Sequence, residues 1–239
     1  MPIRAALRLL TVLPVRGGDT PGNAAAYVPM AGAILGGAGA GIYLLAAKTF
    51  PISIAALATV VFWTALSGVM HEDAPADTGS LRAGRSPRRL VSILTDGRIG
   101  AFGVVLILLS VLARWQALEY LATPRVLQTL IASQAVPRAA MIAMAWCSRP
   151  AGSGVGYVLA STLSTPVAVT AIALGAAAAF LCGWRAGFAI IAGSVLIVQA
   201  VRAWFYRRIG GVNGNSLGFT EQLIEIFVLT MFACRSCAW

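Results

Sequence analysis

The chain alternates between long apolar runs and short polar connections. The apolar runs cover roughly residues 25–47, 51–70, 101–121, 126–147, 157–182, 186–205 and 217–234. Each is close to the roughly 20 residues that an α-helix needs to cross the hydrocarbon core of a bilayer. The runs lack the strict alternation of apolar and polar positions that is typical of strands in a closed barrel. The pattern therefore predicts an all-α, polytopic integral membrane bundle with about six to seven transmembrane helices.

Some segments depart from this simple pattern. Pro166 interrupts the fifth run, and the last run opens with Glu221 and Glu225, so these two are the weakest predicted spans. Residues 3–13 carry two arginines on one helical face and leucines elsewhere, which predicts an amphipathic helix lying in the membrane interface. The glycine- and alanine-rich stretch 32–41 contains small residues at four-residue spacing, which allows close helix packing.

Composition and charge agree with a membrane protein. Of the 239 residues, 59% are hydrophobic and only 11% are charged, and the mean hydropathy is +0.82; a soluble domain carries far more charged surface. The net charge of +10 would suggest nucleic acid in a soluble protein, but no basic stripe interleaved with aromatic residues is present. We therefore expect a lipid bilayer as the partner, and no nucleic acid.

Arginine placement predicts the orientation. With the N-terminus inside, twelve of the 18 basic residues fall in cytoplasmic segments and four on the opposite side, as the positive-inside rule requires. The polar segments 71–100, 149–156 and 206–216 then share the cytoplasmic side, where they could form one site. Since neither an internal repeat nor a soluble domain is visible, residues 1–239 are expected to form a single membrane domain with a cytoplasmic polar loop at 71–100.

The segment 71–100 reads HEDAPADTGSLRAGRSPRRLVSILTDGRIG and holds four of the eight acidic residues and the only histidine. Carboxylates interleaved with arginines favour a divalent metal next to a phosphate, because oxygen ligands hold hard cations and guanidinium groups hold phosphate. Asp73 and Asp77 would share one helical face, where two carboxylates repel each other unless a cation lies between them. Pro75 requires such a helix to begin nearby or to be locally irregular. The alternative is a solvated loop with ordinary charges.

At this point the sequence resembles the cobalamin synthase family, the adenosylcobinamide-GDP ribazoletransferases. H71-E-D73-A-P-A76-D77 followed by D96-G-R98-I-G100-A-F-G103 is similar to the family's H-x-D-G-x-A-D-x-x-D-G and D-S-R-I-G-x-x-G. L10-T-V-L-P14, P29-M-A-G32 and Arg138 match further family positions in order. The stretch G210-G-V-N-G214-N-S-L-G218, with Glu221 and Glu225 after it, resembles the family's G-G-x-T-G-D-x-L-G-A and its trailing glutamates.

The chain departs from the family pattern at several loop positions. Ala74 and Pro75 replace the family's Gly-x, and Ser80 and Leu81 stand where the family has a third loop aspartate and its glycine. The C-terminal Thr-Gly-Asp falls at Asn213, Gly214 and Asn215. Hard cations hold carboxylates much better than amides, so two anionic ligands of the family are missing here.

The resemblance implies a bacterial inner-membrane enzyme of vitamin B12 assembly, with its active-site loops in the cytoplasm and Mg²⁺ as cofactor. A ribose hydroxyl of α-ribazole, or of its 5′-phosphate, would attack the phosphorus attached to cobinamide in adenosylcobinamide-GDP, and GMP would leave. The products would be adenosylcobalamin, or its phosphate, and GMP. Corrinoid and α-ribazole are thus the implied substrates, and a homo-oligomer is left open.

Site roles follow from the same resemblance. The implied metal ligands are Asp73, Asp77 and Asp96, and the implied proton acceptor is His71 or a carboxylate near it. Diphosphate charge would be neutralised by Arg98 with Arg82 or Arg85. The remaining implied substrate-binding residues are Arg138, Asn213, Asn215 and Glu221.

Two alternatives remain. The missing carboxylates permit a non-catalytic homologue that binds corrinoid or acts as a membrane scaffold. A small transporter would use the intramembrane residues Arg114, Glu119 and Arg138 as its substrate path, although paired broken helices and repeat symmetry, which are typical of transporters, are not visible in the sequence.

Overall fold

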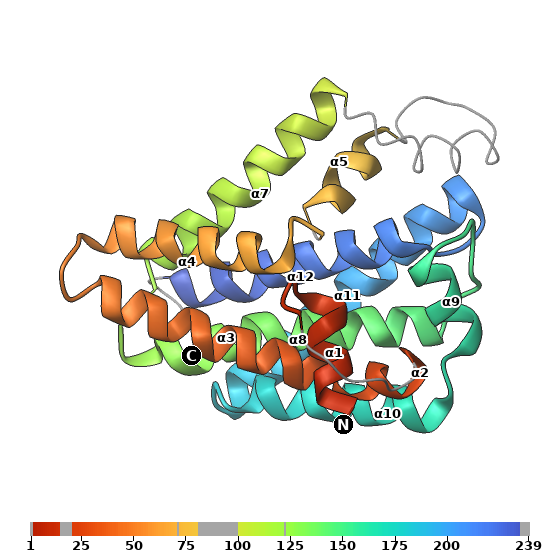
Figure 1. Ribbon diagram of the computed structural model, residues 1–239, viewed down its shortest axis with the longest axis horizontal. Coiled ribbons are helices and arrows are strands. Elements are labelled where there is room, and N and C mark those ends of the chain that lie inside the picture. The colour runs from red at the N-terminus through yellow and green to blue at the C-terminus, as the bar shows by residue number, and fades with distance from the viewer. Residues whose placement is uncertain (1, 15–20, 71, 81–99, 122, 235–239) are drawn as a thin grey trace.

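The computed structural model describes residues 2–14, 21–70, 72–80, 100–121 and 123–234. Within these ranges the regular structure is helical, and the β-structure is limited to an isolated bridge between Pro150 and Val212. Figure 1 shows the long helices side by side, as expected for a helical bundle. The all-α prediction is therefore confirmed.

The helices follow one another through short connections. In chain order they are α1 (Pro2–Leu10), α2 (Pro21–Ala24), η1 (Ala25–Tyr27), α3 (Val28–Ala46), α4 (Ile52–Ser67), α5 (Asp73–Ser80), α7 (Ala101–Glu119), η2 (Thr123–Arg125), α8 (Val126–Trp146), α9 (Val155–Thr162), α10 (Thr165–Phe180), α11 (Trp184–Ile209) and α12 (Gly214–Ala233).

Helix α8 lies at the centre of the bundle, and most of its residues are buried. Helices α3, α10 and α12 pack against it. Two glycines of α3 make the closest approach: a Cβ atom added at Gly32 or Gly36 would overlap the backbone carbonyl oxygens of Gln134 or Leu130 on α8. The predicted role of this small-residue stretch in close helix packing is confirmed.

Fewer helices than predicted qualify as membrane spans by length and composition. Four do in the described part of the chain: residues 25–46 and helices α7, α11 and α12. The pair α9 and α10, bent by 109° at its break, could supply a fifth, and α4 is apolar but shorter. Helix α8 has enough residues, but Gln128, Gln134 and Arg138 lower its hydropathy. The expected span over 157–182 breaks just before Pro166, where the sequence indicated weakness.

The polar segment that follows α4 begins as a packed helix rather than as a loop. Helix α4 ends at Gly68, whose left-handed backbone (φ 62°) turns the chain, and α5 begins at Asp73. Pro75 lies in the first turn of α5, where its missing N–H breaks no intrahelical hydrogen bond. The predicted helix start near Pro75 is thus confirmed, whereas a solvated loop is wrong for residues 73–80.

Helix α5 lies between α7 and α12 (Figure 1). Ala74 and Ala76 on its inner face are buried. A Cβ atom on Gly103 of α7 would come within 2.6 Å of the Ala76 carbonyl oxygen, and one on Gly218 of α12 within 2.8 Å of the Ala74 Cβ. Glycines on both neighbouring helices therefore allow α5 to sit close to each of them.

Candidate functional site

The outer face of α5 carries the two aspartates that the sequence singled out. Asp73 is exposed and Asp77 is half-buried. The Asn215 Nδ2 group, near the start of α12, donates a hydrogen bond of 2.9 Å to Asp77 Oδ2. The fold thus brings together one predicted metal ligand and one predicted substrate-binding residue from distant parts of the chain.

The carboxyl groups of Asp73 and Asp77 both have raised pKa values. Burial is the main cause for each; the charge of Glu72 raises the pKa of Asp73 further, and that of Asp73 raises the pKa of Asp77. The hydrogen bond from Asn215 acts in the opposite direction on Asp77. Because the two carboxylates repel each other, this face of α5 would be stabilised by a bound cation.

A capping box fixes the start of α12 beside Asp77. Asn213 is the N-cap: its Oδ1 accepts a hydrogen bond from the Ser216 backbone N–H, and the Ser216 side chain accepts one from the Asn213 N–H. Asn and Thr are both favourable N-cap residues, so the change from the family's threonine preserves the cap. Whether Asn213 also contacts substrate stays a prediction.

The loop after α8 joins the same end of the molecule. The Ala151 N–H donates to the Val212 carbonyl at 2.8 Å, and the Val212 N–H donates to the Arg149 carbonyl at 2.9 Å. A Cβ atom on Gly156 would overlap the backbone of Gly214, so α9 begins against the start of α12. Described parts of the three polar segments therefore meet at one end of the bundle.

Arg138 and Glu221 lie in the interior and pair with each other. Arg138 Nη1 is 3.1 Å from Glu221 Oε1, and the two side chains are 3% and 0% exposed. Arg138 Nη1 also donates to the backbone and side-chain oxygens of Gln134, at 2.7 and 2.9 Å. The pair links α8 to α12 in the interior. A contact of either residue with substrate stays a prediction.

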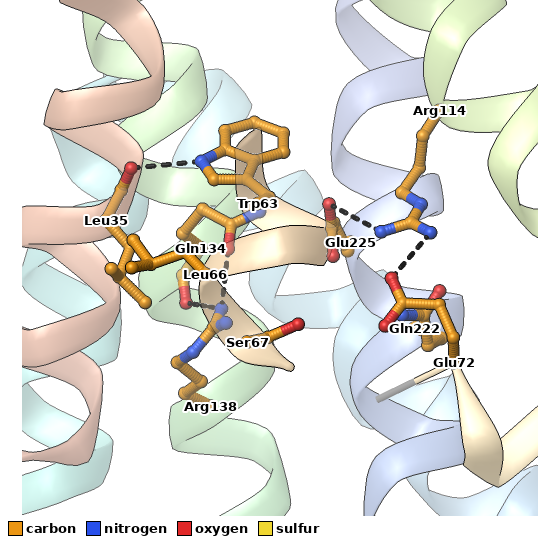
Figure 2. Close-up of a pocket in the computed structure, with 10 residues that line it drawn as sticks. All are labelled: Leu35, Trp63, Leu66, Ser67, Glu72, Arg114, Gln134, Arg138, Gln222 and Glu225. Atoms are coloured by element: carbon orange, nitrogen blue, oxygen red, sulfur yellow. Dashed lines mark hydrogen bonds and ion pairs between the residues drawn. The ribbon is translucent and has the colours of Figure 1, made fainter. Parts of the chain in front are cut away.

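A second buried ionic cluster links α5 to the bundle, and sequence reasoning did not identify it as a unit. The Nη2 atom of Arg114, on α7, lies 3.0 Å from Glu72 Oε1. Its Nη1 atom lies 3.8 Å from Oε1 of Glu225 on α12 (Figure 2). Thr64 Oγ1 of α4 donates to Glu72 at 3.1 Å. Ionisable residues inside apolar helices are the only sequence signal for such a cluster.

Among the described residues, these charges line only a small pocket. The pocket drawn in Figure 2 has a volume of about 10 Å³ for the centres of water molecules, roughly enough for one water. Glu119, the third residue of the transporter hypothesis, is instead at the end of α7, where Gln116 donates to it at 2.8 Å.

Five predicted site residues lie outside the described residues: His71, Arg82, Arg85, Asp96 and Arg98. Their predicted roles as proton acceptor, phosphate ligands and third metal ligand therefore stay predictions.

The described residues could hold a divalent cation, but only as part of a larger site. In the described ranges, no group of three or more histidines, cysteines or carboxylates is close enough to hold a metal by itself. Mg²⁺ is commonly bound by one or two carboxylates together with waters and substrate phosphates. Asp73 and Asp77 lie on one face of α5 and repel each other when both are ionised, so they match that requirement as one or two carboxylate ligands.

Comparison with known proteins gives a consistent result along the chain. The family model for cobalamin-5-phosphate synthase matches residues 2–233. Proteins named adenosylcobinamide-GDP ribazoletransferase are similar: that of Stutzerimonas stutzeri is 30% identical, covering 98% of both chains. That of Bradyrhizobium diazoefficiens is 32% identical over 97% of this chain and 92% of its own, and that of Ralstonia nicotianae 33% identical over 88% and 84%. No solved structure shows a significant match.

Proposed function

Because the chain belongs to the cobalamin-5-phosphate synthase family, we propose that it is a membrane transferase that completes the nucleotide loop of vitamin B12. The donor is adenosylcobinamide-GDP and the acceptor is α-ribazole or its 5′-phosphate. An acceptor ribose hydroxyl attacks the phosphorus attached to cobinamide, the bond from that phosphorus to the GMP oxygen breaks, and GMP leaves. The products are adenosylcobalamin, or its phosphate, and GMP.

The observation that carries this proposal is the contact between Asp77 and Asn215. It joins the two segments in which the family resemblance is most specific, at the end of the bundle where the polar connections meet. Phosphoryl transfer depends mainly on positioning and on neutralising charge. A pair of carboxylates, one exposed and one half-buried, beside a fixed helix N-terminus, whose dipole favours anions, suits that chemistry.

We propose Mg²⁺ as the cofactor, held by Asp73 and Asp77 together with Asp96. Bound there, it would neutralise charge on the diphosphate of the donor. Asn215 orients the Asp77 carboxylate through its hydrogen bond. In the same proposal, Arg98 with Arg82 or Arg85 binds the diphosphate, and His71 accepts the proton of the attacking hydroxyl.

We also propose that this end of the bundle faces the cytoplasm of a bacterial inner membrane, because the arginine count favours that side. A Cys substituted for Asn215, in a background whose native cysteines are replaced, should react with an impermeant maleimide only from the cytoplasmic side. Labelling from the outside would refute this orientation.

A second candidate, a non-catalytic homologue, is favoured by the chemistry of Asn215. The family's motif has an aspartate at this position, whereas the neutral Asn215 amide donates a hydrogen bond to Asp77. A chain that binds corrinoid or acts as a scaffold would tolerate this change, while a synthase would lose an anionic ligand.

Transferase activity separates the two candidates. Purified protein in detergent would receive adenosylcobinamide-GDP, α-ribazole and Mg²⁺, and cobalamin would be followed by chromatography. For a synthase we expect turnover in the native chain, loss of turnover in Asp77→Ala, and native turnover in Glu119→Gln, a carboxylate change at the exposed end of α7. An inactive native chain would refute the synthase, and rescue by Ser80→Asp with Asn215→Asp would then identify a degenerate one.

A further inference from the structure

An apolar groove runs along the bundle between α8, α10 and α11. Its volume is about 220 Å³, and its walls are almost entirely apolar. The walls include the small residues Ala139, Ala143 and Gly175 of α8 and α10. Ile191 and Val198 of α11 line the groove without filling it. Helix α11 is among the candidate membrane spans, with only 28% of its apolar window buried. In a bilayer this groove would therefore open toward lipid chains.

One end of the groove is marked by aromatic residues and arginines. Trp146, Cys147 and Gln199 line that end, and Arg202 follows one turn further along the same face of α11. The Arg202 guanidinium stacks on Tyr206, 5.0 Å from its ring centre. Paired aromatic and basic residues are typical of the interface between hydrocarbon and lipid headgroups.

The part of the chain that forms the groove carries basic but no acidic residues. From residue 120 to residue 220 the sequence contains no aspartate or glutamate but seven arginines. Four of them belong to this end of α8 and α11: Arg149, Arg202, Arg207 and Arg208. The Arg202 guanidinium donates hydrogen bonds to neutral oxygens of Cys147, Ser148 and Gln199. These use three of the five N–H donors of a guanidinium group.

We propose that the groove binds an anionic glycerophospholipid of the surrounding bilayer, with an acyl chain between α8, α10 and α11 and the phosphate group at Arg202. The apolar walls match the acyl chain, and Arg202, whose guanidinium donates to neutral oxygens, matches the anionic headgroup. The same groove with a neutral rim would accept any lipid. Charge complementarity therefore selects the anionic class, and the site is independent of the proposed transferase activity.

The test uses Trp146, which lines the groove, as a fluorescent reporter. The full-length protein is reconstituted in phosphatidylcholine vesicles with increasing fractions of brominated phosphatidylglycerol or brominated phosphatidylcholine, and the signal of Trp146→Phe is subtracted. One arginine near the surface attracts an anionic lipid by about 1 kcal/mol. We therefore expect roughly fivefold preferential quenching of Trp146 by the anionic lipid, lost in Arg202→Gln and largely kept in Arg202→Lys.

Two matched pairs make the result specific. Arg185→Gln, at the other end of α11, should keep the preference, since Arg185 lies away from the groove although it also stacks on a tryptophan. Ala176→Phe, which fills the groove, should reduce quenching by both lipids, whereas Ala177→Phe on the exposed side should not. Equal quenching by both lipids in the native protein, or a preference that survives Arg202→Gln or Ala176→Phe, would overturn the proposal. So would a preference lost equally in Arg185→Gln.

Discussion

The buried pair of Arg138 and Glu221 allows the role of the interior charges to be measured. At 3.1 Å and an effective dielectric constant of about 20, the attraction amounts to about 5 kcal/mol, most of which offsets the cost of removing both charges from water. Removing one partner leaves the other charge buried, which costs about 3–5 kcal/mol. Glu221→Gln and Arg138→Met should each lower the free energy of unfolding by that amount.

The double variant should behave differently from the single ones. With both charges removed, neither side chain carries an uncompensated charge, although Gln134 loses its two hydrogen bonds from Arg138. We expect the double variant to be about 1–3 kcal/mol more stable than the less stable single variant, a coupling typical of residues in direct contact.

The assay is unfolding in mixed micelles of dodecyl maltoside and dodecyl sulfate, followed by the helical circular dichroism signal. Arg185→Met serves as the control, because this exposed arginine should change stability by less than about 0.5 kcal/mol. Two results would refute the assignment as a structural pair. One is a free energy of unfolding of the single variants within 1 kcal/mol of the native value. The other is a double variant whose loss of stability equals the sum of the losses in the two single variants. Turnover that stays absent in a folded double variant would instead support the predicted substrate contact.

Two further predictions concern α5. Gly103→Ala should destabilise the protein by about 1–3 kcal/mol, because the new methyl group must displace the α5 backbone. It should also weaken Mg²⁺ binding, measured by calorimetry. The control Gly37→Ala, where nothing lies within 4 Å of the added Cβ atom, should change neither stability nor Mg²⁺ binding. Acidification should weaken Mg²⁺ binding by protonating Asp73 and Asp77. Because the pKa values of both carboxyl groups are raised, this loss of binding should begin at a higher pH than it would with aspartates of ordinary pKa. The pKa values of these two carboxyl groups are higher in the folded than in the unfolded state, so the metal-free protein should become more stable as the pH falls through them. Asp77→Asn should flatten the pH profile of Mg²⁺ binding and the pH profile of stability. Profiles unchanged by Asp77→Asn would contradict this reasoning.

The sequence predicts local features of the site better than it predicts partners. Asp73 and Asp77 share a helical face, and Pro75 marks where that helix starts, because both depend on spacing over a few residues. The neighbour of Asp77 is different. Nothing near Asp77 in the chain points to Asn215. The arginine distribution and the family resemblance placed the two segments on the same side and in one site, but neither indicated this contact.

The interior was the least predictable part. Arg114 lies in an apolar run, and the sequence offered a transporter path as one explanation. Its actual partners, Glu72 and Glu225, depend on how α5, α7 and α12 pack, which no local pattern encodes. Helix α8 likewise reads as another membrane span, yet its polar residues reflect a central position among other helices rather than contact with lipid.

The order in which the paired charges occur along the chain has a consequence for biogenesis. Glu72 is synthesised before Arg114, so when α7 enters the membrane its arginine already has a carboxylate with which to pair. Within the described residues, the carboxylate that pairs with Arg138 is Glu221, which belongs to the last helix and is synthesised later. Since an unpaired arginine is costly in the hydrocarbon core, α8 would complete its insertion only when α12 arrives. A ribosome stalled before α12 would therefore leave α8 more accessible to water-soluble probes than α7.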